Sequence, residues 1–158
     1  MFRKMLMAKQ ELPEEEARAI LENGEIGILG VNGDDGYPYA VPLNYVYADG
    51  KIYFHCAKAG YKLDAIRRAD KVCFTVIGRA DIMREKLDTY YTSAMIFGRA
   101  RILEDEAEIR QAVTTLGNKF CDDPRAVEAE INDTWNALCS VEITIEHITG
   151  RQAEDLIK

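Results

Sequence analysis

The feature that most constrains the fold of this 158-residue chain is an alternating run followed by a hairpin signal. Across residues 37–48, tyrosine and aliphatic side chains occupy every second position, which is the period of a β-strand. Asp49 and Gly50 come next, and both tolerate the positive φ angles of a tight turn. Residues 51–57 then return as a second strand. Antiparallel strands are therefore the basis of this fold.

Two prolines restrict where the first of these strands can lie. Neither Pro38 nor Pro42 can donate a hydrogen bond to a neighbouring strand. The strand is therefore expected at an edge, at a bulge, or beside something other than a strand, such as a ligand. Its second face is too apolar for water, and we expect a second copy of the chain to cover it.

A glycine-containing loop follows the hairpin and opens a helix. Residues 61–70 place apolar side chains at helical spacing, directly after Gly60, and Lys62 falls in the first turn. Free backbone N–H groups, the positive end of the helix dipole and one ammonium group together outline an anion site. Phosphate is the expected ligand, although a lysine such as Lys62 on a surface helix is more often simply solvated.

The remaining chain predicts more strands, interrupted by helices. The interruptions are not regular crossovers, which favours one domain, residues 1–158, with a mainly β fold and peripheral helices. We predict an antiparallel barrel of about six strands and an irregular loop over residues 78–88. The strand 72–77 is expected to be buried on both sides. The other expected strands are 26–31, 90–103 and 141–150, and the other expected helices are 13–23, 104–116 and 124–138.

Composition excludes several classes of function. A formal net charge of −7 argues against nucleic acid or an anionic membrane as the main partner, whereas one local cationic pocket can still hold an anionic cofactor. The four cysteines form no C-x-x-C pair, so neither a zinc ribbon nor a dithiol motif is predicted, and no metal site is expected. The first ten residues do not fit a signal peptide, which makes the cytoplasm the expected location.

Three segments of the sequence also resemble a known family. They read GYPYAVPLNYVY over residues 36–47, YFHCAKAGYKLD over 53–64 and VCFTV over 72–76. This pattern resembles the nitroimidazole-resistance branch of the pyridoxamine 5'-phosphate oxidase-like proteins. The resemblance implies a split β-barrel that binds FMN at the interface of a homodimer.

The resemblance also implies which residues contact the cofactor. The segment from His55 to Lys62 corresponds to the part of the family that lies at the FMN phosphate and ribityl chain, and it includes Ala57 and Gly60. The segment that would run along the isoalloxazine ring is Val41, Pro42, Leu43, Asn44 and Tyr45. Tyr91 and Ser93 correspond to a strand that reaches the cofactor from the second subunit, although Thr92 stands where relatives often have a basic residue.

Several of these side chains have plainer interpretations. His55 is a candidate catalytic proton donor, because the unperturbed pKa of imidazole lies near neutrality, but it could also rest on a sheet surface. Packing at a subunit interface is the preferred role for Tyr45 and Tyr47. His147 is expected to be structural, and Trp135, at helical spacing, belongs more often to a core than to a flavin site.

The predicted function is an FMN-dependent oxidoreductase that reduces a small oxidised compound, with nitroaromatics as one candidate and NAD(P)H or another reductant as the electron source. Two alternatives remain open: a flavin-binding or sensing module without turnover, and a haem-binding split barrel with His55 or His147 on the iron. Oxidation of pyridoxamine phosphate itself is less favoured, because no cluster of basic residues is available for a second phosphate.

Overall fold

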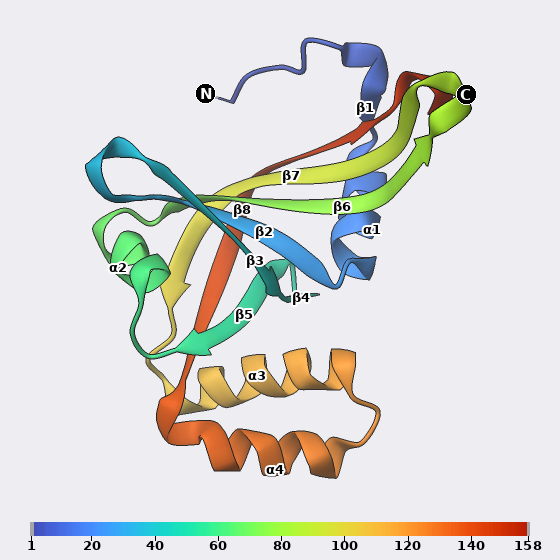
Figure 1. The fold of residues 1–158 in the computed structure, drawn as a ribbon. Helices are drawn as coiled ribbons and strands as arrows, with labels where there is room; N and C mark the ends of the chain where they lie inside the picture. The colour runs from blue at the N-terminus through green and yellow to red at the C-terminus, as the bar shows by residue number, and fades with distance from the viewer. Residues whose placement is uncertain (1, 158) are drawn as a thin grey trace.

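The computed structural model describes residues 2–157, which form one antiparallel sheet with helices around it (Figure 1). The strands are β1 (Glu11–Leu12), β2 (Ile26–Asn32), β3 (Pro38–Asn44), β4 (Val46–Ala48), β5 (Lys51–Ala57), β6 (Lys71–Met83), β7 (Asp88–Ile102) and β8 (Leu138–Gln152). The helices are α1 (Glu14–Asn23), α2 (Tyr61–Arg68), α3 (Glu106–Phe120) and α4 (Pro124–Thr134). Short 3-10 turns connect several of them, including η3 (Arg84–Lys86) and η4 (Trp135–Ala137).

The strand order makes this sheet a split barrel. Its strands follow the order β3-β2-β6-β7-β8-β5-β4, with β1 added to β8. β3 and β4 are consecutive in the chain, separated only by Tyr45, yet they stand at opposite ends of this order. The sheet therefore curls until its two ends are neighbours, as Figure 1 shows. The predicted fold class is confirmed, and so is the edge position of β3 that the prolines indicated.

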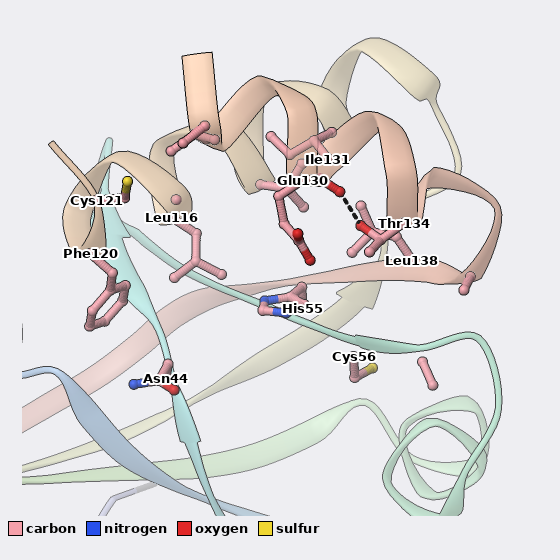
Figure 2. Close-up of a pocket in the computed structure, with 16 residues that line it drawn as sticks. Asn44, His55, Cys56, Leu116, Phe120, Cys121, Glu130, Ile131, Thr134 and Leu138 are labelled. Atoms are coloured by element: carbon pink, nitrogen blue, oxygen red, sulfur yellow. Dashed lines mark hydrogen bonds between the residues drawn. The ribbon is translucent and has the colours of Figure 1, made fainter. Parts of the chain in front are cut away.

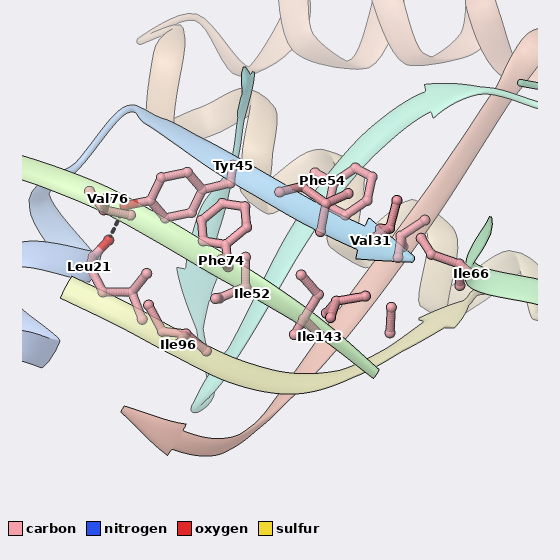
Figure 3. Close-up of a cluster of buried hydrophobic side chains, with 14 of the residues drawn as sticks. Leu21, Val31, Tyr45, Ile52, Phe54, Ile66, Phe74, Val76, Ile96 and Ile143 are labelled. Carbon is pink, nitrogen blue, oxygen red and sulfur yellow. Dashed lines mark hydrogen bonds between the residues drawn. The ribbon is translucent and has the colours of Figure 1, made fainter. Parts of the chain in front are cut away.

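The interior of the barrel is a single apolar core that β5 and β6 help to fill (Figure 3). Its largest fully buried side chains are Tyr45, Phe54 and Phe74. The Tyr45 and Phe74 rings meet edge to face, with their centroids 5.0 Å apart. The Tyr45 hydroxyl donates to the carbonyl oxygen of Leu21 at 2.5 Å. Interface packing was the wrong prediction for Tyr45, because this ring is buried inside its own chain.

A lysine from α3 anchors the helices to this barrel. The Lys119 ammonium donates to the backbone carbonyls of Gly24 and Tyr45 and lies 4.4 Å from the centroid of the Tyr45 ring. Burial lowers the pKa of Lys119. One half-buried cation thus binds two backbone carbonyls, one of them at Tyr45, the residue that joins β3 to β4.

The largest departure from the sequence-based prediction is the segment 78–88. In place of an irregular loop, β6 continues to Met83 and pairs with the first residues of β7, after a bulge between Ile77 and Arg79. Both faces of this β6–β7 arm are largely exposed, so its residues show no apolar alternation. The 72–77 strand is also half-buried and not buried on both sides: Val72, Phe74 and Val76 point inward, and the residues between them are more exposed.

The helical hairpin of α3 and α4 has a small core of its own. Val113, Val127 and Ile131 are buried there, and Trp135 packs against them. Asp105 and Asp123 cap the two helices by accepting from the backbone N–H groups of Glu108 and Arg125. α3 continues four residues beyond the expected end, to Phe120, whereas α4 ends at Thr134. None of the helices in the described residues is long and apolar enough to cross a membrane.

Candidate functional site

A cavity of about 850 Å³ lies between the barrel and the helical hairpin (Figure 2). The barrel wall contributes residues from the end of β3 and the end of β5, and the helical wall contributes residues from α3, α4 and the turn before β8. Residues in the barrel wall are Asn44, His55, Cys56 and Ala57; those in the helical wall include Leu116, Phe120, Cys121, Val127, Glu130, Ile131, Thr134 and Leu138. This volume suits a small-molecule site.

The strand period places His55 in the cavity. Phe54 and Cys56 point toward the barrel core, so His55 between them points away from it. β5 pairs with β8 along its whole length, with His55 opposite Ser140, which holds the imidazole on a rigid strand. Asn44 reaches the same cavity from the end of β3, where its side-chain amide donates to the carbonyl oxygen of Glu25 at 3.3 Å.

The helical wall is mostly apolar, with one acid. Leu116, Phe120 and Ile131 present hydrocarbon surface to the cavity. Glu130 and His55 extend into the cavity from opposite walls, as Figure 2 shows. The Thr134 hydroxyl is already engaged, because it donates to the carbonyl oxygen of Glu130 at 2.7 Å. The cavity therefore combines apolar walls with an imidazole, an amide and a carboxylate.

The predicted anion site lies beside this cavity. Gly60 has φ 143° at the start of α2, a conformation that an L side chain rarely adopts, and its carbonyl accepts from the N–H of Leu63 at 3.1 Å. Lys62 is half-buried in the first turn. Its positive charge is near enough to Cys56 to oppose the rise that burial causes in the pKa of that thiol. Neither Gly60 nor Lys62 lines the cavity itself.

Other predicted residues lie on different faces of β3. Val41 and Leu43 pack against the barrel core, and Tyr45 is inside it. Pro42 faces outward, toward a shallow cavity of about 330 Å³ that it shares with Ile26, Ile28, Thr75 and Ile77. These residues can meet a ligand through backbone groups, because β3 has a strand partner on one side only.

Tyr91 and Ser93 lie away from the cavity in this chain. Ser93 stands between Ile77 and Arg151 in the sheet register, and the Tyr91 ring lies under the Arg151 guanidinium, 5.8 Å from its centre. Since the resemblance assigned them to the site of a second subunit, a single chain does not test their role. That role stays a prediction.

Sequence reasoning missed the helical wall. Trp135 was predicted to belong to a core, and it packs there against Val127 and Ile131, but Glu130 was not singled out. A signal was present in the length of the apolar stripe of α3, since Phe120 follows Leu116 at a spacing of four. Groups of three or more potential metal ligands are absent from the described residues.

The fold and the cavity define a class: a split β-barrel protein with a small-molecule cavity under a helical hairpin. The chain belongs to the pyridoxamine 5'-phosphate oxidase family, whose sequence profile matches residues 13–152. The family that the motifs resemble is thereby confirmed. No curated protein matches the sequence.

Solved structures share the fold at low sequence identity. A candidate 5-nitroimidazole antibiotic resistance protein from Bacteroides thetaiotaomicron covers 90% of this chain and 86% of its own, with TM-score 0.75 and 21% identity. An FAD-binding protein from Mesorhizobium loti covers 92% and 98%, with TM-score 0.67 and 22% identity. An FAD and haem binding protein from Mycobacterium smegmatis covers 92% and 74%, with TM-score 0.68 and 16% identity. All three structures share the fold of this chain.

Proposed function

We propose that this protein is an FMN-binding homodimer that passes reducing equivalents to a small oxidised compound. The observation that carries the proposal is the convergence of Asn44, His55 and Ala57, three residues of the family-like segments, on one cavity in a chain of this family. Similar structures described as FAD-binding support a flavin as the ligand class.

The residues present fit a flavin. Apolar walls suit a planar ring system, and the free edge of β3 offers backbone donors and acceptors for its polar rim. Gly60 and Lys62 would hold the phosphate, through the free N–H groups of α2 and one ammonium. A bound flavin would supply the electron transfer to the acceptor.

The chain's own residues would position the reaction. His55, on its paired strand, can hold or deliver a proton within the cavity, and Asn44 can orient a polar group of a ligand. The hydrocarbon surface of Leu116, Phe120 and Ile131 excludes water from this space. Glu130 is the acid of the helical wall and would disfavour anionic substrates there.

A second copy of the chain would complete the site. The outer face of the sheet exposes apolar side chains that belong to neighbouring strands: Ile26 at 59%, Ile77 at 58%, and Ile28, Met95 and Phe97 at 36–39%. An apolar face shared by three strands suits a two-fold interface. In that dimer the partner would bring Tyr91 and Ser93 to the cofactor.

The partners follow from the same chemistry. We propose a neutral, small electron acceptor, with nitroaromatic compounds as the first class to test because of the similarity to the candidate 5-nitroimidazole antibiotic resistance protein. NAD(P)H is the first reductant to test. The net charge of −7 disfavours nucleic acid and anionic membranes as partners.

One observation supports haem as a second candidate cofactor. A structure described as an FAD and haem binding protein shares the fold, and His55 is an exposed imidazole in the cavity. His147 is the poorer candidate ligand, because its ring stacks on Phe2 with centroids 4.5 Å apart. Replacement of His55, and not of His147, should then abolish a haem spectrum.

The test is a visible absorption spectrum of the purified protein before and after anaerobic addition of NADH or NADPH. A flavin spectrum that bleaches supports the oxidoreductase. A flavin that stays oxidised with NADH, NADPH and other biological reductants supports a binding or sensing module. A Soret band assigns haem, and a colourless protein that also fails to bind added FMN contradicts the proposal.

A further inference from the structure

Two cysteines lie side by side on adjacent strands of the barrel, at the edge of the cavity. Cys56 on β5 and Cys139 on β8 are direct partners in the antiparallel register. Opposed residues of such a pair have Cα atoms about 4.5–5.5 Å apart, within the range of about 4.4–6.8 Å that disulfides require. Both side chains point to the core face, and Cys139 is close enough to Cys56 to contribute to the rise in its pKa. A disulfide can therefore form here without a change in the strand register.

The two thiols differ in access. Cys56 lines the cavity and is half-buried, whereas Cys139 is only 7% exposed and does not line it. Of the other two cysteines, Cys73 is opposite Gly30 and Phe97 in the sheet, and Cys121, at the end of α3, lines the opposite wall of the cavity. All four cysteines are free. Of the pair on β5 and β8, a reagent that enters the cavity would meet Cys56 first, with Cys139 behind it.

The surroundings of Cys56 make this pair slow to react. Burial, and then the neighbouring Cys139, raise the pKa of the Cys56 thiol to about 11, while the Lys62 ammonium opposes that rise. Because the thiolate is the nucleophile, the pair stays reduced under mild conditions and reacts only with a sustained supply of oxidant. A redox cofactor bound in the cavity would be a source of such an oxidant close to this pair.

We propose that Cys56 and Cys139 are a slowly oxidised thiol pair that sustained exposure to peroxide closes to a disulfide at the floor of the cavity. The Cys56 thiolate attacks a peroxide oxygen, the O–O bond breaks, and after protonation water or an alcohol leaves, which gives a sulfenic acid on Cys56. The Cys139 sulfur then attacks the Cys56 sulfur, the S–O bond breaks, and the hydroxide leaves as water with the Cys139 proton. Two thiols lose two electrons in total, and one peroxide gains them.

The disulfide would join β5 to β8 at the residue that follows His55. It would remove a thiol from the cavity wall and restrict the strand that carries the imidazole. The pair thus gives the cavity a redox-dependent wall. This inference stands on the strand register and does not depend on the identity of the cofactor.

The experiment treats the purified protein with hydrogen peroxide and maps its thiols by mass spectrometry under non-reducing conditions. We expect titratable thiols to fall from four, the cysteine content of the chain, to two. Trypsin should yield one new species that joins peptide 52–58, which holds Cys56, to peptide 126–151, which holds Cys139. A Cys73→Ser, Cys121→Ser double variant, which keeps the pair, should give the same linked species.

A Cys139→Ser variant separates the two steps. Without the resolving thiol, Cys56 should accumulate as a sulfenic acid that dimedone traps, whereas the wild-type chain should trap little. Three results would overturn the proposal: Cys56 left unmodified by peroxide, Cys56 oxidised in the wild-type chain without a link to Cys139, or a link that runs between two chains.

Discussion

The two walls of the cavity are built in different ways. The barrel wall belongs to β5, which is paired with β8 along its length and filled from behind by Phe54 in the main core. The helical wall rests on a small core of Val113, Val127 and Ile131 and is anchored to the barrel by Lys119. The barrel wall therefore supplies a rigid frame for the polar groups, and the helical wall determines the size and polarity of the cavity.

The largest difference in stability between the two walls is expected when a core side chain is truncated in each. Phe54→Ala removes a fully buried ring from the barrel and should lower the free energy of unfolding by about 3–5 kcal/mol. Ile131→Ala removes a side chain from the smaller helical core and should cost about 2–3 kcal/mol, at the low end for such a change. Chemical denaturation measures both values, and an equal or reversed order would contradict the comparison.

The next largest effect on stability is expected at Lys119, which links the helical wall to the barrel wall. Lys119→Met keeps the apolar stem but leaves the carbonyls of Gly24 and Tyr45 without their charged donor, which should cost about 1.5–3 kcal/mol of unfolding free energy. Lys58→Met, at an exposed lysine, is the control and should change stability by less than about 0.5 kcal/mol. If Lys119→Met is as stable as the control, the lysine does not hold the helices to the barrel.

FMN binding should depend on Lys62, in the anion site beside the cavity. Lys62→Ala removes a charge-assisted phosphate contact and should weaken FMN binding by about ten- to a hundredfold, or roughly 1.5–3 kcal/mol. Lys9→Ala removes the same charge from an exposed position outside the segment 55–62 and should leave the affinity nearly unchanged. Fluorescence titration with FMN compares the two, and equal affinities would remove Lys62 from the site.

The raised pKa of the Cys56 thiol should make the stability of the protein depend on pH in the alkaline range. The folded chain keeps the Cys56 proton up to about pH 11, whereas the unfolded chain loses it near the ordinary pKa of 9.0. The folded state then binds more protons, so the free energy of unfolding falls as pH rises through this window. Of the groups near Cys56, Cys139 raises its pKa further and Lys62 lowers it. Cys56→Ser should make the fall shallower, with Cys73→Ser as the control for loss of a thiol; an unchanged slope in Cys56→Ser would contradict the assignment.

The barrel wall could be predicted from the sequence, and the helical wall could not. Alternation, two prolines and the Asp49-Gly50 turn gave an edge strand and a hairpin, because these signals act over a few residues. Glu130 and His55 line the same cavity although they are 75 positions apart in the sequence, and no local pattern encodes that arrangement. The inward position of Tyr45 was equally hidden, since a tyrosine in an alternating run suits a core as well as an interface.

The central claim is that a flavin occupies the cavity between β5 and the helical hairpin. Its most direct test is an FMN titration of the wild-type chain, Ala57→Trp and Ala107→Trp. Ala57 is exposed and lines the cavity, so a tryptophan there fills it without disturbing the core, whereas the exposed Ala107 on α3 lies outside both the lining and the segment 55–62. We expect the wild-type chain and Ala107→Trp to bind FMN with similar affinity and Ala57→Trp to lose binding. Unchanged FMN binding by Ala57→Trp would contradict the claim.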